Sequence, residues 1–456
     1  MARGGDRGGL AGATFTAFKW NYVGTLVRAF SQLAIGIVLA RLLGPEPFGL
    51  VAVGWLVLGL GNLIADFGFG AALVQRREIS DADIRFVFTV QVLLGLGLTV
   101  LVASSAGLIA RVFNDPDVVP VMQALSLVFV LQAFGQTAAS LLRRGLDFRG
   151  LQTSQVSSYL FGFLLLGIPL AYAGFGVWSL VIAQLVQSLL FASFLYLRVR
   201  HPVRPLLAGR AGFFDFGAKV MGTNLLNQSI LNIDTFFVGR YFGTFDLGLY
   251  NRAYTLMFTS MTSLTSALQA VLFSSYSKLQ DRTEALRKVY LASSGMVVLV
   301  TAPVFGGAAI VSGTVIEGLY GARWLEAAPL LVPLALSMVF HAAMTPAGPL
   351  LTGMGRVERE LYVQVFGIAL LVPVMYFTSG ISLVALAWGV FAVYVVRALA
   401  LISVALRSVG SGWWEMLVAA RGGVLVLCGV APVLLAVDSF LASLGVSAAL
   451  RLLAEV

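Results

Sequence analysis

Cysteine, histidine and charge are all scarce in this sequence of 456 residues. The single cysteine, Cys428, has no partner in the chain, which excludes an internal disulfide and a cysteine-based metal site. The two histidines, His201 and His341, lie far apart in sequence, which argues against a metal cluster built on them. The sequence therefore predicts neither a bound metal nor a cofactor.

The scarcity of charge defines the class of protein. Charged residues make up 11% of the chain and hydrophobic residues 59%, whereas soluble domains carry about a quarter charged residues. The mean hydropathy is +0.92. Because so many apolar residues cannot all be buried in soluble cores, they must face lipid. We expect an all-α integral membrane protein.

Apolar runs of spanning length recur along the chain. A helix needs about 20 mostly apolar residues to cross the ~30 Å hydrocarbon core. We predict thirteen spans at 18–41, 47–72, 85–111, 118–142, 151–173, 176–198, 214–240, 247–273, 287–317, 327–353, 358–378, 382–406 and 418–437. A fourteenth segment, 439–456, is short for a crossing and contains Arg451, so the expected total is about 12–14 helices.

The distribution of positive charge predicts the orientation. With the N-terminus in the cytoplasm, the inner loops carry 22 lysines and arginines and the outer loops carry four. Cytoplasmic loops of plasma membrane proteins show this excess. The net charge of +9 is therefore mostly a topology signal rather than a sign of nucleic-acid binding.

Two passages repeat at an offset of 199 residues, Gly36–Leu50 and Thr235–Leu249. An arginine, two glycines and a leucine coincide in them, and each passage lies at the outer end of a span. We expect each helix to end with its arginine and then a glycine in the left-handed helical conformation. Any helical hairpin can converge on this pattern, but six spans precede the second copy and none precede the first. This spacing favours two parallel repeats.

The repeat predicts the domain organisation. We expect an N-terminal six-helix bundle at 1–205, a C-terminal six-helix bundle at 206–410, and an additional membrane helix or helices at 411–456. Parallel halves of this kind are a known transporter design, with the substrate bound between them.

Five short motifs carry a resemblance to a known family. They are Arg41–Gly49, Asp66–Gly70, Arg143–Arg149, Asp234–Gly243 and Leu247–Tyr250. In their order and spacing they resemble the polysaccharide-export (Wzx-type) branch of the multidrug/oligosaccharidyl-lipid/polysaccharide flippase superfamily. The resemblance runs from about residue 15 to 410. Relatives usually have fourteen spans, so the C-terminal segment departs from the family pattern.

The resemblance implies both a fold and a function. It implies two six-helix bundles around a central cavity, and movement of an undecaprenyl-diphosphate-linked oligosaccharide from the inner to the outer leaflet. This step serves the synthesis of O-antigen, capsule or exopolysaccharide. The implied partners are the lipid-linked substrate, membrane lipids, and a polysaccharide polymerase with its chain-length machinery. A flippase of this kind is not an enzyme.

Ionisable side chains inside spans are candidate working residues, because inserting one costs about 2.5–3.5 kcal/mol. Arg28, Lys219 and Arg397 are such residues, and on a cavity wall they would attract a diphosphate. Arginine would bind it through its bidentate fork and lysine as a point charge. The alternative is that each side chain pairs locally or extends to a membrane interface.

Acidic and amide residues within spans have two interpretations each. Asp66 is predicted either to pair with Arg28 or to carry a coupling proton. A structural ion pair is favoured for Asp234 and Arg252, which lie at similar depth on neighbouring spans.

Three amides, Asn224, Asn227 and Gln228, give the predicted seventh span a polar face. They form either a water-lined cavity wall or hydrogen bonds between helices. His341 is favoured as a packed, hydrogen-bonded residue over a proton carrier.

Two other functions compete with the flippase. The sequence has no phosphate-cradling nucleotide loop, so an ion gradient or downstream polymerisation would give transport its direction. A cation-coupled exporter of small molecules on the same fold is the first alternative, although it should favour acidic cavity residues. A membrane-embedded oligosaccharide polymerase or ligase is the second, although such enzymes need a larger outer loop than any predicted here.

Overall fold

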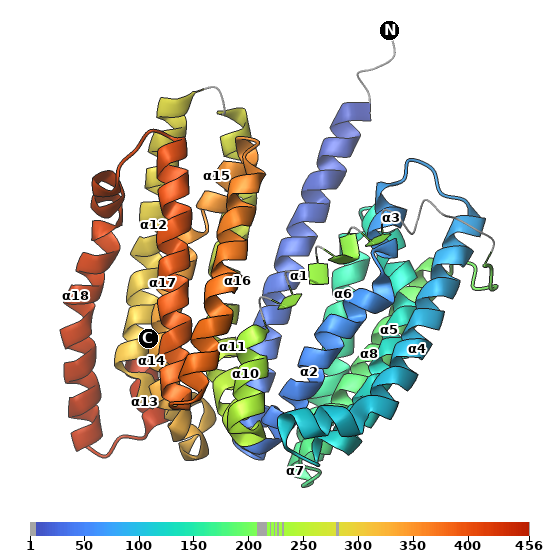
Figure 1. Ribbon diagram of the computed structural model, residues 1–456, viewed down its shortest axis with the longest axis horizontal. Coiled ribbons are helices and arrows are strands. Elements are labelled where there is room, and N and C mark those ends of the chain that lie inside the picture. Colours follow the sequence, from blue (N-terminus) through green and yellow to red (C-terminus); the bar gives the residue numbers. More distant parts are fainter. Residues whose placement is uncertain are drawn as a thin grey trace. The chain divides into compact units, whose positions relative to one another are not determined.

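The computed structural model describes residues 6–207, 217–218, 220–222, 224–225, 228–229, 232–279 and 282–455. Every regular element among these residues is a helix (Figure 1). The chain divides into two compact units, Met1–Phe245 and Asp246–Val456.

The first unit is organised around α5. Its helices are α1 (Asp6–Leu43), α2 (Pro45–Asp66), α3 (Phe69–Gln75), α4 (Asp81–Phe113), α5 (Val118–Arg144), α6 (Phe148–Tyr159), the π-helical segment η1 (Leu160–Gly167), α7 (Ile168–Tyr172), α8 (Val177–Val199) and α10 (Ile233–Phe242). α5 packs against α2, α4 and α8, and α1 packs against α6. The side chains of Val128 and Phe129 on α5 are fully buried by this packing.

The second unit contains the remaining helices. They are α11 (Thr244–Lys278), α12 (Thr283–Ile310), α13 (Ser312–Tyr320), the 3-10 segment η2 (Ala322–Ala327), α14 (Ala328–Met344), α15 (Ala347–Gly353), α16 (Val357–Ser379), α17 (Leu383–Ser408), α18 (Trp413–Ser443) and α19 (Ala448–Glu455). α18 packs along α12. A Cβ atom on Gly295 would lie 2.6 Å from the carbonyl oxygen of Ala419, so this glycine permits the close approach of the two helices.

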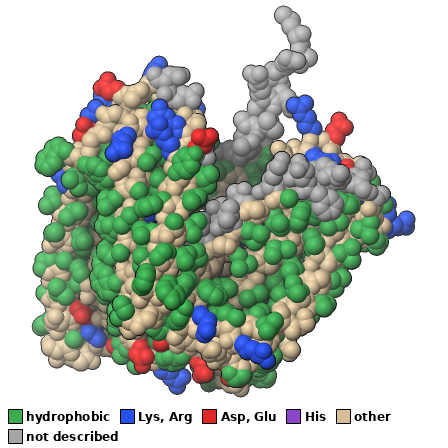
Figure 2. All heavy atoms as spheres, viewed as in Figure 1, with side chains coloured by type: hydrophobic (Ala, Val, Ile, Leu, Met, Phe, Trp, Pro, Cys, Tyr) green, Lys and Arg blue, Asp and Glu red, His purple; other side chains and the backbone are tan. Residues whose placement is uncertain are grey.

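The helices identify a multi-pass membrane protein. Within the described residues, 12 helices are long and apolar enough to cross a membrane. Figure 2 shows hydrophobic side chains over the middle of the visible face of each unit and charged side chains gathered toward the ends. This distribution is the one expected when the middle of each unit faces lipid.

The predicted spans agree with these helices, with two corrections. The span predicted at 47–72 is wrong at its end, because the backbone turns at Phe67 (φ 47°) and Gly68 (φ 71°) and divides it into α2 and α3. The possible fourteenth span is also wrong. That segment contains the end of α18 and then α19, which has 8 residues and so reaches only about 12 Å. The span predicted at 214–240 lies largely outside the described residues.

The repeated turn has the same backbone in both copies. Gly44 follows α1 with φ 80° and ψ −177°, and Gly243 follows α10 with φ 88° and ψ 178°. The predicted positive φ is confirmed, but the predicted left-handed helical conformation is wrong, because ψ lies near 180° in both. This region of backbone space is essentially restricted to glycine.

Within the first unit, α10 and the first residue of α11 contact the end of α4 and the loop after it. The Thr244 hydroxyl donates to the Asp115 carboxylate at 2.6 Å, and the Phe236 ring meets the edge of Phe113 with centroids 6.0 Å apart. These contacts explain why the compact units divide after Phe245. The predicted domains 1–205, 206–410 and 411–456 rest on the sequence repeat and stay predictions.

Candidate functional site

A polar cavity of about 530 Å³ lies within the second unit. Five helices line it, with Gln269 from α11, His341 from α14, Thr352 from α15, Glu360 from α16 and Arg397 from α17. The cavity therefore brings together a cation, a carboxylate, an imidazole, an amide and a hydroxyl inside helices that span the membrane. Such groups are expensive in the membrane interior and mark a functional site.

Arg397 lines this cavity. Its stem crosses α16 at Gly367, where an added Cβ would lie 3.2 Å from Arg397 Cδ. Its Nε is buried and has no hydrogen-bond partner within the described chain. Local pairing, one of the two interpretations for Arg397, is therefore not what the described residues show. The predicted position of Arg397 on a cavity between the two bundles stays a prediction.

Glu360 and His341 face the same cavity. The Glu360 carboxylate lies over Gly348 of α15, where an added Cβ would be 3.0 Å from its Oε1. It is electrostatically coupled to Arg397, yet no ion pair joins the two residues, both of which the structure describes. The His341 ring stacks on Tyr394 with centroids 5.2 Å apart, and its Nδ1 is buried without a hydrogen-bond partner in the part of the chain described. His341 is thus packed, as favoured, but Nδ1 is not hydrogen-bonded there.

Arg28 is a half-buried residue of α1 in the first unit. Nearby on the same helix, Asn21 accepts a hydrogen bond from Gln152 of α6 at 2.9 Å. No hydrogen bond or ion pair joins Arg28 to another residue among those described. Its role in binding a diphosphate stays a prediction.

Asp66 is the centre of a partly buried polar chain in the first unit. Its Oδ1 accepts hydrogen bonds from the Gln91 amide at 2.8 Å and from the Gly70 backbone N–H at 3.3 Å. Gln91 in turn accepts from the Thr137 hydroxyl at 2.6 Å, and its side chain is fully buried. These contacts link α2, α3, α4 and α5. No ion pair between Asp66 and Arg28 exists among the described residues, and a proton-carrying role for Asp66 stays a prediction.

The polar face predicted around residue 224 is only partly described. Asn224 is exposed, and Gln228 is half-buried with its amide close to Gly59 of α2. Lys219 and Asn227 lie outside the described residues. Their roles, and the choice between a cavity wall and hydrogen bonds between helices, stay predictions.

Asp234 and Arg252 fall in different units, so their predicted ion pair stays a prediction. Each residue is nearly fully buried within its own unit. Asp234 Oδ1 accepts a hydrogen bond from the backbone N–H of Thr235 at 2.7 Å.

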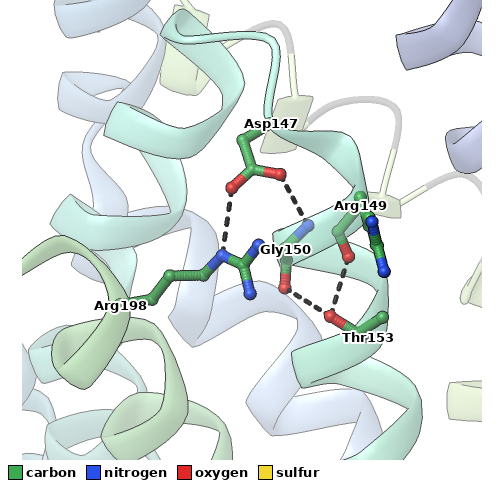
Figure 3. Close-up of polar contacts among 5 residues, drawn as sticks. All are labelled: Asp147, Arg149, Gly150, Thr153 and Arg198. Atoms are coloured by element: carbon green, nitrogen blue, oxygen red, sulfur yellow. Dashed lines mark hydrogen bonds and ion pairs between the residues drawn. The ribbon is translucent and has the colours of Figure 1, made fainter.

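The motif Arg143–Arg149 forms the corner between α5 and α6 in the first unit. Asp147 caps α6 by accepting from the Gly150 N–H at 2.8 Å, and it accepts from Arg198 Nε at 3.0 Å (Figure 3). Partial burial alone would raise the pKa of Asp147. The two hydrogen bonds and the positive charges of Arg198 and Arg149 outweigh burial and hold the pKa below its ordinary value.

Arg144 of the same motif holds the end of α3. Its guanidinium donates to the carbonyl oxygens of Leu73 at 2.8 Å and Arg77 at 2.7 Å, and to that of Arg76. The Leu73 carbonyl belongs to the last turn of α3, where it has no partner within the helix, and the carbonyls of Arg76 and Arg77 follow directly after it. The motif that carries the family resemblance thus has a structural role at this corner.

Two site residues were missed by sequence reasoning, Gln91 and Glu360. Gln91 lies within the uncharged run from Phe86 to Ala110, where a lone amide was a usable signal. Glu360 directly precedes the uncharged run from Leu361 to Val396, and a charge at the start of a span gives no sequence signal that it faces a cavity. In the structure it occupies the first turn of α16 and faces the cavity.

Comparison with solved structures defines the fold class. The chain resembles the lipid II flippase MurJ in its inward closed conformation, with a TM-score of 0.69, 14% sequence identity, and coverage of 92% of this chain and 91% of that one. It also resembles a multidrug resistance MATE family transporter in its inward-facing conformation, with a TM-score of 0.66, 16% identity, and coverage of 85% and 98%. The fold is that of two-lobed helical transporters.

Comparison of sequences shows the family. Residues 38–329 match the model of the polysaccharide biosynthesis protein family, and the chain belongs to this family. It is 28% identical over 365 residues to the lipopolysaccharide biosynthesis protein WzxC of Escherichia coli K12, covering 79% of this chain and 74% of that protein. It is 28% identical over 383 residues to the teichuronic acid biosynthesis protein TuaB of Bacillus subtilis, covering 81% and 77%. The succinoglycan biosynthesis transport protein ExoT of Rhizobium meliloti is 28% identical over 323 residues, covering 70% and 65%.

Proposed function

We propose that this protein is a flippase that moves an undecaprenyl-diphosphate-linked oligosaccharide from the inner to the outer leaflet by alternating access. The observation that carries the proposal is the combination of family and fold. The chain belongs to the polysaccharide biosynthesis protein family and shares its fold with a lipid II flippase. Its relatives serve the synthesis of three chemically different surface polysaccharides, which points to the shared lipid-linked diphosphate as the recognised group.

Two arginines inside membrane spans provide the groups that would bind the diphosphate. Arg28 and Arg397 have no ion-pair partner among the described residues, and the head of Arg397 lies in a polar cavity. An arginine binds two phosphate oxygens at once through parallel N–H···O bonds. In the proposed cycle these residues and Lys219 hold the diphosphate, the sugars travel in water, and the polyprenyl tail stays in lipid.

The setting follows from the same proposal. The protein lies in the plasma membrane with a cytoplasmic N-terminus, and a polysaccharide polymerase with its chain-length machinery uses the product. The substrate crosses the membrane without a change in its covalent bonds, so the protein is not an enzyme. An ion gradient or downstream polymerisation gives the movement its direction.

Reconstitution tests the proposal. Purified protein in liposomes with a fluorescent polyprenyl-diphosphate sugar should make the sugar accessible at the outer leaflet. Arg28→Ala and Arg397→Ala should each slow this movement about 10- to 100-fold, since a charged hydrogen bond contributes about 1.5–3 kcal/mol. Lys19→Ala on α1 and Arg407→Ala on α17 are matched controls, because both side chains are exposed on the same helices. Wild-type rates in both cavity variants would remove these arginines from the binding site.

A cation-coupled exporter of small molecules is the second candidate. It is favoured by the likeness to a multidrug transporter fold and by the buried carboxylate of Asp66 with its amide ligand Gln91. Efflux of a lipophilic cation from liposomes with an inward proton or sodium gradient distinguishes it. Efflux that stops in Asp66→Asn, without any movement of the lipid-linked sugar, would establish the exporter in place of the flippase.

A further inference from the structure

We propose that the cavity of the second unit is a proton-linked phosphate site, in which Arg397 binds the phosphate and Glu360 takes up a proton as the phosphate enters. The inference rests on the proposed function, because it names the part of the protein that receives the diphosphate and links its capture to protons. It adds two residues, Glu360 and His341, to the working site.

The cavity has the donors that a phosphate requires. Arg397 Nε is buried and His341 Nδ1 is buried, and neither has a hydrogen-bond partner among the described residues. A buried polar atom without a partner costs about 1–3 kcal/mol, so an arrangement with two of them is best completed by a ligand. Nδ1 donates in the form of the imidazole that carries its hydrogen there. The remaining polar groups at the cavity are the Gln269 amide and the hydroxyls of Thr345 and Thr352, which suit phosphate oxygens.

Glu360 makes the site sensitive to protons. Its carboxylate shares the cavity with Arg397 but forms no ion pair with it. The guanidinium therefore stays available to bind a phosphate. A phosphate bound at Arg397 places a second negative charge in the same cavity. Two anions in one site disfavour each other, and the carboxylate relieves the repulsion by binding a proton from water.

No other charged residue lines the cavity among those described. The titratable groups that share the cavity with Glu360 are Arg397 from α17 and His341 from α14, while α11 and α15 contribute the uncharged Gln269 and Thr352. On its own helix, the Gln364 side chain hydrogen-bonds to the Glu360 carboxylate. Gly348 leaves the space that the carboxylate occupies. Protonation of Glu360 should therefore strengthen phosphate binding as the pH falls, by up to about tenfold per pH unit for one proton.

Calorimetry on the full-length protein in uncharged nanodiscs tests the proposal with inorganic pyrophosphate as the probe. Titrations between pH 5.5 and 7.5, in two buffers with different heats of ionisation, report affinity and proton uptake together. Pyrophosphate itself binds protons in this range, but equally for every variant. The difference between wild type and Glu360→Gln therefore belongs to Glu360.

The variants have distinct expected results. Glu360→Gln should bind tightly at every pH and take up one proton fewer, Arg397→Gln should lose binding at least tenfold, and Arg397→Lys should retain part of it. Glu358→Gln and Arg407→Gln, with exposed side chains on the same two helices, should match wild type. An unchanged proton uptake in Glu360→Gln, or full affinity in Arg397→Gln, would overturn the proposal.

A competition experiment identifies the source of the phosphate. Farnesyl diphosphate incorporated in the nanodisc should displace pyrophosphate if the site takes a lipid-linked diphosphate. Absence of displacement would overturn the assignment to the transported lipid and leave a site for free anions. Because binding is measured without transport, a protein that binds with proton uptake but moves no lipid-linked sugar would refute the flippase alone.

Discussion

The two units differ in how they accommodate a charged side chain inside their helices. In the first unit, the carboxylate of Asp66 is surrounded by donors from Gln91 and Gly70. In the second unit, the guanidinium of Arg397 lies in a cavity with its Nε unpartnered in the described chain. The two glycine turns, at Gly44 and Gly243, have the same backbone and both lie in the first unit. The first unit thus satisfies the Asp66 carboxylate with its own donors, whereas the second unit leaves Arg397 Nε without a partner among the described residues.

The largest effect is expected from breaking the hydrogen bonds around Asp66. Gln91→Leu should lower the free energy of unfolding by about 3 kcal/mol, because it removes an amide donor from Asp66 and the acceptor of the Thr137 hydroxyl in the membrane interior. Denaturant or thermal unfolding in detergent measures the loss. Gln123→Leu on α5, where the side chain is exposed, is the control and should change little. Equal stability of the two variants would show that the chain of hydrogen bonds around Asp66 does not hold the unit together.

The second prediction concerns the two equivalent glycine turns of the first unit. Gly44→Ala and Gly243→Ala should each destabilise by about 2 kcal/mol, because a Cβ is strained in this backbone region. Nothing lies within 4 Å of the added atom at either position, so the loss comes from the backbone alone and should be equal in both. Gly107→Ala on α4 has the same open space in ordinary helical backbone and serves as the control. Unfolding curves that separate the Gly44 and Gly243 variants widely would contradict the equivalence of the two turns.

The third prediction concerns Arg397 in the cavity of the second unit. Arg397→Met keeps the length of the side chain and removes an unpartnered charge, so it should leave stability unchanged or raise it by about 1 kcal/mol. The same variant should fail in the liposome assay. A marked loss of stability in unfolding experiments would mean that Arg397 holds the unit together, as Gln91 is expected to do in the first unit.

The smallest effect is expected at Asp147, which caps α6 in the first unit. Asp147→Ala removes the cap of α6 and should destabilise by about 0.5–1 kcal/mol at neutral pH. Because the folded pKa of Asp147 is held below its ordinary value, its contribution is present above about pH 4, the unfolded value, and is lost as the pH falls through the folded pKa. Unfolding curves of wild type and variant should therefore converge only in strong acid. A difference that already disappears between pH 7 and 5 would assign the effect to another group.

Most of the fold follows from the sequence because lipid imposes a simple rule. Each span must be an apolar helix of sufficient length, so runs such as 118–142 predict α5 to within two residues. The break after Asp66 was missed, because the left-handed turn at Phe67 and Gly68 leaves the apolar pattern uninterrupted.

The candidate site was only partly predictable. Depth in a span singled out Arg397 as a lone cation, but its neighbours come from five different helices. Glu360 reaches the cavity because α15 and α16 meet at Gly348, a contact between helices that no local pattern reveals. Gln91 and Thr137 are likewise brought together across α4 and α5.

Arg144 has a mechanical consequence for any transport cycle. One guanidinium joins the last residue of α5 to the end of α3 and the residues after it, and Asp115 joins the loop after α4 to Thr244, the first residue of α11. Since α4 and α5 pack along each other, we expect these segments to move together. A lysine at position 144 would reach fewer carbonyls from its one nitrogen and would hold α3 to α5 less firmly.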